Sequence, residues 1–465
     1  LVLLALTQFL VVLDSSIVNV ALPAIKESLG FSDGSLQWIL TAYVLTFGGF
    51  LLLGGRAADL YGRRKVLVIG LAGFTITSFL IGLSQSSESF IVLRALQGLT
   101  AAFMSPAAMS VLLTTFKEGA ERNRALSIWS IVAAGGAAVG VLLGGIITQL
   151  FGWHWDFFIN VPIGILTIIG ILKYVPAHSK EESDKNLDLP GAALITSGLI
   201  ALVFAISQAP EVGIANPYVI ASFVASIALI IAFLFNESRV KHPLVPLSIF
   251  KLRNVSGGNL IMIPAMAGML GMFFFLSLYM QNILGYTPIQ SGLAFLPFPI
   301  ILGTMAWNAP KFVDRFGIKK LLIAGTILPT IGIALFITLP LNGNYFINIL
   351  PSILLIPTGM GLFFLAAILA ATSGVPARES GLVSGLINTS QQVGGALGIA
   401  VLAGVAAFAT GTSDAPSAQL AGFHAAFVAA TLLMLGALAI ALFVIKVPKK
   451  QTGTVKIPEG VHTAA

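Results

Sequence analysis

Residues 55–65 read GRAADLYGRRK, a short polar run that separates two long apolar segments. A related run lies 255 residues further along, where an acid, a glycine and two basic residues recur at the same spacing: Asp59, Gly62, Arg64 and Lys65 in the first copy, and Asp314, Gly317, Lys319 and Lys320 in the second. A helix that crosses a bilayer needs about 20 apolar residues, and the segments around both copies are that long. The pattern therefore predicts an all-α polytopic membrane protein made of two related halves.

The composition supports the same class. Of the 465 residues, 57% are hydrophobic and 9% are charged, whereas soluble domains carry about 25% charged residues. A water-soluble protein so poor in charge could not cover its own surface, so lipid is the expected solvent. Strand-length alternation is absent, which argues against a transmembrane barrel. Residues 1–23 have no basic leader and no small-residue cleavage site, so we expect a first span that follows a short cytoplasmic leader, not a signal peptide.

Several classes of function are excluded by what the sequence lacks. Without cysteine there is no disulfide, thiolate metal site or cysteine nucleophile. The five histidines are scattered without a second ligand at helical spacing, so we expect no metal and no cofactor. No phosphate-binding Gly-Lys-Ser/Thr loop is present, which argues against an ATP-driven pump. The spans hold no zinc motif, paired catalytic carboxylates or serine–histidine pair, so we predict that the protein is not an enzyme.

Fourteen spans are predicted, and the basic residues orient them. The spans fall at 3–24, 36–54, 66–84, 89–115, 125–150, 157–172, 190–208, 216–236, 256–282, 288–309, 321–339, 346–373, 380–409 and 421–445. With the N-terminus in the cytoplasm, 23 of the 25 basic residues lie in cytoplasmic loops or the tail. Lys26 lies outside and Arg94 lies within a span. This asymmetry supports both the span number and cytoplasmic termini, and it explains the net charge of +7 without nucleic acid.

The spacing of the repeated loop divides the chain. The two copies are separated by eight spans, whereas two six-span halves would separate them by six, so we interpret the seventh and eighth spans as an insertion. The interval from Lys173 to Leu189 holds the densest charge run and is expected to be a solvated loop. The predicted units are a six-helix half at 1–174, a cytoplasmic loop at 175–189, two inserted spans at 190–240, a second six-helix half at 241–446 and a cytoplasmic tail at 447–465.

Six motifs together resemble a known family. Residues 55–65 resemble the loop signature of the major facilitator superfamily, and LDSSIVNVALP at 13–23 is similar to the first-span motif of its fourteen-helix drug:proton antiporters, the EmrB/QacA group. Further matches are Arg94, Gln97 and Gly98 in the fourth span, WHW at 153–155 with INVPIG at 159–164, Tyr279, Gln281, Gly285, Tyr286 and Pro288 at the ninth-to-tenth junction, and SGLINT at 384–389. The resemblance implies a major facilitator fold and multidrug efflux by exchange for protons.

The sequence departs from the family's pattern at three points. Val141 follows Gly140 where a proline is usual in the fifth-span antiporter motif, which leaves strict antiport open. His154 and Asp156 stand where an arginine and an apolar residue are more usual at the start of the sixth span. Gln391 stands where an arginine is common.

The proton-coupling residues are predicted from charge at membrane depth. Of 18 acidic residues, 17 fall in loops, tails or span ends, and Asp14 alone lies in the middle of a span. An ionised, unpaired carboxylate there costs several kcal/mol, so Asp14 must line a wet cavity, pair with a cation or hold a proton. We predict that Asp14 is the coupling acid, that Arg94 favours its ionised form in one conformation, and that Gln97 joins the network from one turn away. A permanent structural clamp is the alternative.

The repeated loops are predicted to act as a conformational latch. This set comprises Gly55, Asp59, Gly62, Arg63, Arg64, Asp314 and Gly317. Asp59 is expected to pair with Arg63 or Arg64, or to cap a helix N-terminus in the other half, and Gly62 suits unusual backbone angles. An ordinary solvated loop is the alternative.

Two further sets of residues are predicted to pack helices and to bind substrate. Helix packing is assigned to four glycines at near-helical spacing in the fifth span: Gly136, Gly140, Gly144 and Gly145. Five of the ten methionines lie between Met262 and Met280, and methionine and aromatic walls adapt to varied apolar ligands, although lipid-facing filler is equally compatible. The predicted substrate cavity comprises Asn19, Met266, Met269, Phe273, Gln281, Asn388 and Gln392.

The sequence therefore predicts a secondary active transporter that exports small lipophilic or cationic compounds in exchange for protons. Export of a native lipid or metabolite, with different or no proton coupling, remains the alternative. We expect a multi-pass monomer in the cell membrane, plasma or inner, whose partners are the lipid bilayer, protons and substrate, with no nucleic acid. A need for accessory efflux components is left open.

Overall fold

The computed structural model describes residues 1–116, 120–176, 188–241, 243–373, 375, 380–411, 413 and 415–446. This part of the chain is helical and contains no β-strand, which confirms the predicted all-α class. The first part of the chain forms α1 (Val2–Leu29), α2 (Asp33–Leu36), α3 (Trp38–Tyr61), α4 (Arg63–Gly82), α5 (Ser87–Thr115), α6 (Ala120–Phe151), α7 (His154–Phe158) and α8 (Asn160–Tyr174).

The remainder of the chain is built in the same way. It forms α9 (Leu189–Val212), α10 (Pro217–Arg239), η1 (Leu247–Lys251), α11 (Arg253–Leu278), η2 (Tyr279–Ile283), α12 (Pro288–Phe295), α13 (Pro297–Phe316), α14 (Ile318–Leu335), η3 (Phe336–Thr338), η4 (Tyr345–Ile349), α15 (Leu350–Thr372), α16 (Ser380–Thr410), α17 (Pro416–Ala439) and η6 (Ile440–Val444).

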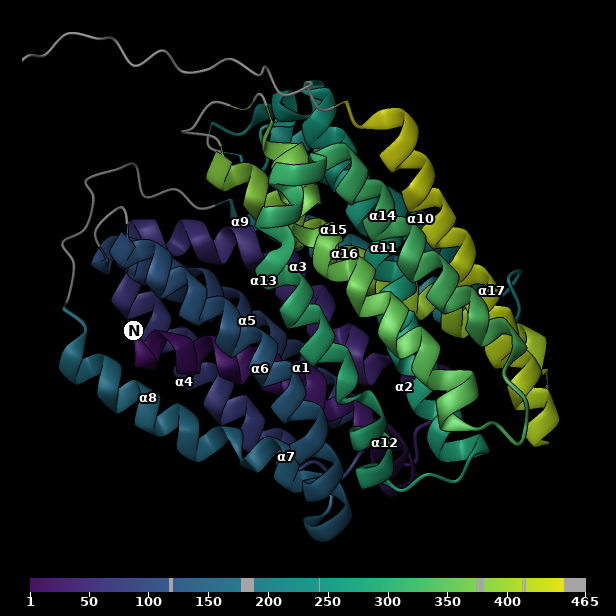
Figure 1. Cartoon of the computed structure of the whole chain (residues 1–465). Coiled ribbons are helices and arrows are strands. Elements are labelled where there is room, and N and C mark those ends of the chain that lie inside the picture. Colours follow the sequence, from purple (N-terminus) through teal and green to yellow (C-terminus); the bar gives the residue numbers. More distant parts are fainter. Residues whose placement is uncertain are drawn as a thin grey trace, which may run out of the picture.

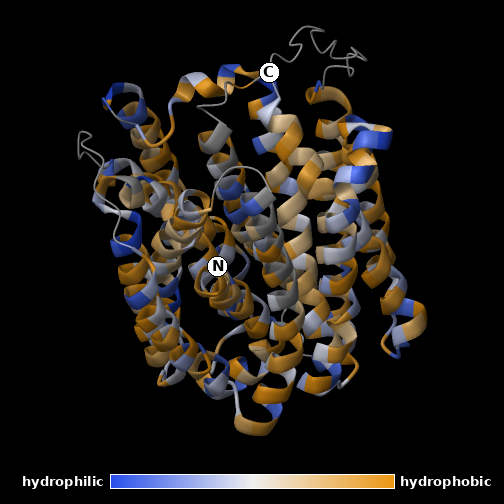
Figure 2. Ribbon diagram, turned by 60° about the vertical axis from the view of Figure 1, so that its left-hand side comes forward, coloured by the Kyte–Doolittle hydropathy of each residue, from blue (hydrophilic) through white to orange (hydrophobic). Residues whose placement is uncertain are grey.

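The helices have the length and composition of membrane spans. Among the described residues, 13 helical segments are long and apolar enough to cross a bilayer, and α6 adds a shorter apolar stretch, Ala138–Phe151. Figure 2 shows hydrophobic residues along the long helices and hydrophilic residues gathered near the helix ends. Backbone groups in hydrocarbon must satisfy their hydrogen bonds within the segment, which selects helices here. The chain is therefore a multi-pass membrane protein.

The two halves share one framework. The helices α1–α8 pack together, the helices α11–α17 pack together beside them, and Figure 1 shows these groups in purple to blue and in green to yellow. Shifted by 255 residues, α3, α4 and α8 begin or end within a few residues of α13, α14 and α17. The glycine of each repeated loop joins two helices with a positive φ, 97° at Gly62 and 84° at Gly317. Only glycine adopts this conformation without strain, so the repeat preserves a helix–turn–helix corner.

The inserted helices α9 and α10 lie at the junction of the halves. Helix α9 packs against α10, against α3 of the first half and against α16 of the second. Its Val203 is fully buried in a small apolar cluster with Leu45 and Ala396, and Gln37 donates a hydrogen bond of 2.5 Å to the hydroxyl of Ser207. Helix α10 remains mostly exposed on the outer surface, as expected for a helix that contacts lipid. The exact boundaries of the predicted units stay a prediction.

The glycines of α6 allow close approach of neighbouring helices. A Cβ atom on Gly136 would lie 3.2 Å from the Phe9 ring, and one on Gly140 would overlap the Ser16 hydroxyl, both on α1. A Cβ on Gly145 would instead lie 2.6 Å from the carbonyl oxygen of Pro288, where α12 of the second half begins. The predicted small-residue face therefore packs α6 against α1 within its half and against α12 across the halves.

We predict that Gly144→Ala destabilises the α1–α6 contact. The new methyl group would lie 2.8 Å from Cγ1 and 2.9 Å from the carbonyl oxygen of Ile17, and overpacking of this kind costs about 1–3 kcal/mol. The thermal unfolding midpoint of detergent-purified protein should fall. The matched control is Gly436→Ala in α17, where a Cβ meets no heavy atom within 4 Å. Equal midpoints for the two variants would contradict the assigned contact.

Candidate functional site

A buried ion pair lies in the middle of the first half. Asp14 of α1 and Arg94 of α5 are 0% and 1% exposed, and Nη1 of Arg94 lies 2.6 Å from Oδ2 of Asp14. The same Nη1 donates to Oε1 of Gln97 at 2.6 Å, and Nε2 of Gln97 donates to Oδ1 of Asp14 at 2.9 Å. The three predicted proton-coupling residues are thus one hydrogen-bonded triangle. Their role in coupling stays a prediction.

Neighbouring helices complete the hydrogen bonding of this triangle. Asn160 at the start of α8 donates to Oδ1 of Asp14 at 3.2 Å, and Gln97 donates to the Ser78 hydroxyl of α4 at 2.8 Å. Nε of Arg94 donates to the carbonyl oxygen of Ile39, in the first turn of α3, at 3.0 Å. The Asp14 carboxylate therefore accepts three side-chain hydrogen bonds, which stabilise its negative charge. Five helices of the first half contribute to one buried network.

Arg94 separates Asp14 from a central cavity. Its guanidinium carbon lies 4.5 Å from the centroid of the Tyr43 ring, a cation–π geometry. Arg94 and Tyr43 both line a cavity of about 960 Å³, while Asp14 lies behind them. The lining runs from Arg94 to Gln8 and Leu113, near the start of α1 and the end of α5. The cavity thus extends from the ion pair toward the end of the bundle at which α1 begins.

Both halves contribute to the lining of this cavity. Five of the seven predicted cavity residues line it: Asn19 of α1, Met266 and Met269 of α11, and Asn388 and Gln392 of α16. Apolar walls come from residues such as Phe47, Met109 and Trp129. A pocket of this size with apolar walls and a few amides suits a drug-sized ligand.

Two predicted cavity residues lie elsewhere, so their assignment to the cavity is corrected. Phe273 does not line the cavity, because its ring packs on Phe298 and Phe295 at centroid distances of 4.6 and 5.4 Å. Gln281 does not line the cavity either, because its side chain packs against α1. Its Nε2 donates to the carbonyl oxygen of Val20 at 3.0 Å. Both residues sit on α11–η2, where apolar residues are spread over all faces of the helix. The sequence of this segment therefore does not mark the face that meets the cavity.

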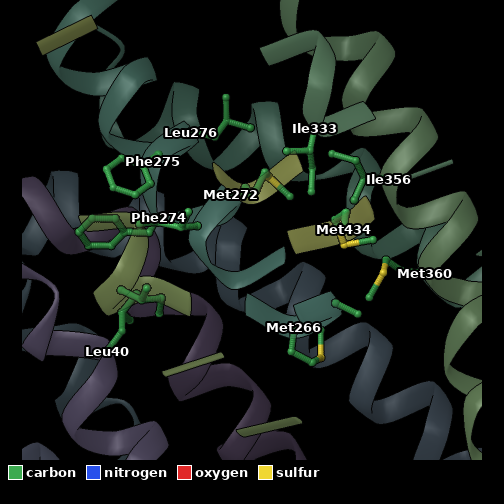
Figure 3. Packing of buried hydrophobic residues seen from close by; sticks show 14 of the residues in the cluster. Leu40, Met266, Met272, Phe274, Phe275, Leu276, Ile333, Ile356, Met360 and Met434 are labelled. Atoms are coloured by element: carbon green, nitrogen blue, oxygen red, sulfur yellow. The ribbon is translucent and has the colours of Figure 1, made fainter. Parts of the chain in front are cut away.

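The methionine cluster is mainly packing core. Met262, Met272 and Met280 are fully buried, and Figure 3 shows Met272 among side chains from α14, α15 and α17. Of the five methionines between 262 and 280, Met266 and Met269 reach the cavity. The cluster is therefore neither a ligand wall as a whole nor lipid-facing filler.

The halves touch at the end opposite the cavity. The Ser277 hydroxyl of α11 donates to the carbonyl oxygen of Asn19 at 2.7 Å, alongside the Gln281 contact. On the other side of α1, the backbone N–H of Ile289 in α12 donates to Oε1 of Gln149 in α6 at 3.3 Å. We name these contacts the closed end. These contacts close the bundle at the end opposite the cavity. The halves also pack side by side, through α3 with α16 and through α6 with α12.

The predicted latch residues act within each half. Nη2 of Arg64 donates to the carbonyl oxygen of Leu172 at 2.5 Å, near the end of α8. Its repeat equivalent, Lys319, donates to the carbonyl oxygens of Leu442 and Ile445 at 2.9 and 2.6 Å, near the end of the last helix. A cation at a helix C-terminus is favourable. Each loop thus ties the first corner of its half to its last helix. The side chain of Asp59 lies outside the described residues, Gly55 packs near Pro106, and a latch role stays a prediction.

Sequence reasoning missed three buried acids at the span ends. Asp156, Asp188 and Glu237 are 0%, 5% and 4% exposed. Asp188 caps α9 and accepts two hydrogen bonds from Asn236, at 2.9 and 2.8 Å. Nothing in composition distinguishes a span end packed against neighbours from one in water. The sequence did contain one indication of a buried polar site. Asp156 and Asn160 are four residues apart, a spacing that places two polar side chains on one face of a helix.

The fold and this site define the protein as a membrane transporter and not an enzyme. The chain belongs to the Major Facilitator Superfamily, whose family model matches residues 4–399.

Curated relatives and solved structures agree with this assignment. The chain is 38% identical to the puromycin resistance protein pur8 of Streptomyces alboniger, over 88% of this chain and 82% of the relative. It is 39% identical to the cephamycin export protein CmcT of Amycolatopsis lactamdurans, over 94% and 90%. A mutant of the nucleoside transporter NupG shares the fold with a TM-score of 0.69, at 12% identity, over 94% of this chain and 98% of that one.

We predict that Arg94→Ala strongly destabilises the protein. Removing one partner of a buried ion pair leaves an uncompensated charge and costs about 3–5 kcal/mol. The double variant Asp14→Asn/Arg94→Ala should recover much of this loss in a thermal unfolding assay, because neither charge remains. The matched control is Arg239→Ala, an exposed arginine whose guanidinium carbon lies 4.0 Å from the centroid of the Phe235 ring. Additive losses in the double variant would show that the two charges do not stabilise one another.

Proposed function

We propose that this protein exports small lipophilic compounds across the cell membrane in exchange for protons, as a member of the fourteen-helix drug:proton antiporter group. The observation that carries the proposal is the buried Asp14–Arg94 pair, which lies directly behind the wall of a cavity shared by both halves. Two relatives above 35% identity are named for puromycin resistance and cephamycin export. Their names support efflux of antibiotic-sized molecules as the activity.

The ion pair offers a physical route from proton binding to movement of the halves. A proton on Asp14 removes the negative charge that offsets Arg94, and a lone buried cation is costly. Arg94 lines the cavity, so it is free to seek a new partner there or to withdraw from it. The two protonation states of Asp14 therefore favour different arrangements of α1 and α5. That difference is what a proton gradient needs in order to drive a conformational cycle.

The lining of the cavity favours lipophilic substrates, because its described residues include no acidic side chain that would bind a cation. Among the described lining residues the charged side chain is Arg94, and the other polar groups are mainly amides and hydroxyls, as at Asn19, Asn388 and Ser105. Most of the wall is apolar. A cationic substrate would have to compete with Arg94, so uncharged lipophilic compounds are the preferred class.

The orientation follows from the basic residues. With cytoplasmic termini, the cavity extends toward the cytoplasm, and the closed end faces the opposite side of the membrane. This is the arrangement that an exporter uses to load substrate from inside the cell or from the inner leaflet. The protein acts as a monomer in this scheme, because one chain supplies both halves of the cavity.

The coupling role of Asp14 is tested by Asp14→Asn in inverted membrane vesicles with an acidic lumen. The probes are puromycin and a panel of lipophilic dyes. We expect pH-driven uptake of the probes to fall by roughly a hundredfold or more, because an amide cannot carry the proton. The matched control is Glu27→Gln, which removes an exposed carboxyl group from the same helix. Full-rate uptake by the Asp14→Asn variant would refute proton coupling through this residue.

The cavity is tested by Asn388→Trp, which places a large ring in the lining on α16. We expect the KM for the bulkier probes to rise by about tenfold, since one lost ligand subsite costs on the order of 1.4 kcal/mol. The control is Phe408→Trp on the same helix, at a residue that is 84% exposed. Unchanged KM values for the Asn388→Trp variant, with a raised KM for the control, would place the substrate outside this cavity.

A further inference from the structure

Asp156 is a second fully buried acid in the first half. It lies in α7, and Thr148 near the end of α6 donates a hydrogen bond of 2.6 Å to its Oδ2. Its Oδ1 is buried and has no hydrogen-bond partner among the described residues. The proposed function makes no use of Asp156.

An ionised Asp156 would be poorly compensated. A carboxylate removed from water without a cation or sufficient hydrogen bonds is costly. Within the described part of the chain, Asp156 has one hydroxyl donor and no cation, whereas Asp14 has a guanidinium and two amides. Two buried acids of the same half are therefore in opposite electrostatic situations. Asp156 is suited to hold a proton while Asp14 is ionised.

The charged groups on the helices around α7 favour this difference. The helices packed against α7 are α1, α4, α6 and α8, and α5 reaches it through the Phe90 ring. Of these, α4, α6 and α8 carry their charged residues near the ends that lie away from α7, at 63–65, 121–124 and 173. Helix α1 contributes Asp14, besides Lys26 and the exposed Glu27 at its end. None of these cations belongs to the span interior beside Asp156.

The remaining charged groups lie on α5 and on α7 itself. Helix α5 carries the exposed Glu88 at its start and Arg94, which is already paired with Asp14. On α7, His154 stacks on Trp153 at 3.8 Å between ring centroids. Among the described residues of this half, the buried cation is thus Arg94, and its counter-ion is the other acid.

Asn160 contacts Asp14 and lies one helical turn from Asp156. It stands at the start of α8, and this spacing places the side chains of Asp156 and Asn160 on one face. Its Nδ2 donates to Asp14, while its Oδ1 is buried and has no partner among the described residues. Oδ1 of Asn160 and Oδ1 of Asp156 thus both lack a hydrogen-bond donor in the described part of the chain, and a proton on Asp156 would supply one. The order Thr148, Asp156, Asn160, Asp14 runs from the end of α6 to the ion pair.

This polar chain approaches Asp14 from the side away from the cavity. Thr148 lies four residues before the turn at Gly152 that ends α6, and Phe151 and Trp155 beside it are 65% and 53% exposed. The cavity reaches the pair through Arg94 and extends to the other end of the bundle. The ion pair therefore has a polar connection toward each end, and the two are distinct.

We propose that Asp156 is the proton donor to Asp14, and that Asp156 and Asn160 form a proton pathway from the closed-end side of the membrane. The inference rests on the proposed function, in which Asp14 is the coupling acid. In the transfer step, the O–H bond of the neutral Asp156 carboxyl group breaks and an O–H bond forms on the Asp14 carboxylate. Asp156 becomes the carboxylate, Asp14 becomes neutral, and Arg94 loses its counter-ion. A proton from water at the closed end then restores neutral Asp156, so charge and atoms balance.

The pathway separates the routes of proton and substrate. The substrate occupies the cavity in front of Arg94, and the proton reaches Asp14 from behind it. An exporter built in this way is able to take up a proton from outside while the cavity still faces the cytoplasm and the closed end holds the halves together. Proton uptake would then precede opening of the closed end.

The test compares Asp156→Asn, Asp156→Glu and Asp14→Asn in the full-length transporter, in inverted vesicles loaded at several luminal pH values. Two rates are measured for puromycin: uptake driven by the pH gradient, and exchange of labelled for unlabelled puromycin with no gradient. We expect Asp156→Asn to lower the driven rate by roughly tenfold or more and to flatten its dependence on luminal pH. Its exchange rate and KM should match those of the wild type, and Asp156→Glu should retain much of the driven rate.

The control is Glu88→Gln at the start of α5, an acid at the same end of the half that lies outside the buried chain. Wild-type driven rates and pH dependence in Asp156→Asn would overturn the pathway. Equal loss of driven transport and exchange in both Asp156 variants would assign the residue a purely structural role and also overturn it. If Asp14→Asn retains driven uptake, the proposed function itself fails, whereas loss in Asp14→Asn with wild-type behaviour in Asp156→Asn removes only this inference.

Discussion

The contact between the Asp14 carboxylate and the Arg94 guanidinium organises the first half of this transporter. Both side chains are almost fully buried, so each depends on the other and on amide and carbonyl partners for its solvation. The network's partners come from α4, from the first turn of α3, from α5 and from α8, which fixes how these helices approach α1. The glycines of α6 allow α1 to be held tightly from its other side. The buried ion pair thus lies where five helices of the first half meet.

The second half repeats the framework without repeating this chemistry. Shifted by 255 residues, Asp14 falls on Met269 and Arg94 falls on Ile349. Met269 lines the cavity and Ile349 is fully buried. The corner loops keep their glycine and their cation, and in both halves that cation caps the end of the last helix. Helix geometry is therefore shared, whereas the buried ion pair belongs to one half and part of the apolar cavity wall to the other.

The sequence predicted the ion pair because charge in the middle of an apolar span is rare enough to stand out. Asp14 and Arg94 were each singled out in this way, and Gln97 followed from its position three residues after Arg94. Asp156 was noted only as a departure from the family's pattern, and its burial was not predicted, because it lies near a span end where acids are ordinary. Phe273 was placed in the cavity because its segment is rich in methionine and aromatic residues, and Gln281 because its amide could offer a polar contact. Both instead contact other helices. An apolar stretch predicts that its side chains are shielded from water. It does not say whether lipid, another helix or a ligand covers them.

The sequence by itself determined the helical membrane class, the positions of the spans, the repeated corner loops and the identity of the central ion pair. Each of these depends on properties of one segment, namely its length, its polarity or a charge where none is expected. The tertiary structure decided which faces of the apolar helices meet the cavity, where the halves close, and that Asn160 of α8 bonds to Asp14 of α1. These features depend on how helices that are apolar all round are rotated and packed, and for such helices sequence periodicity carries little information about facing.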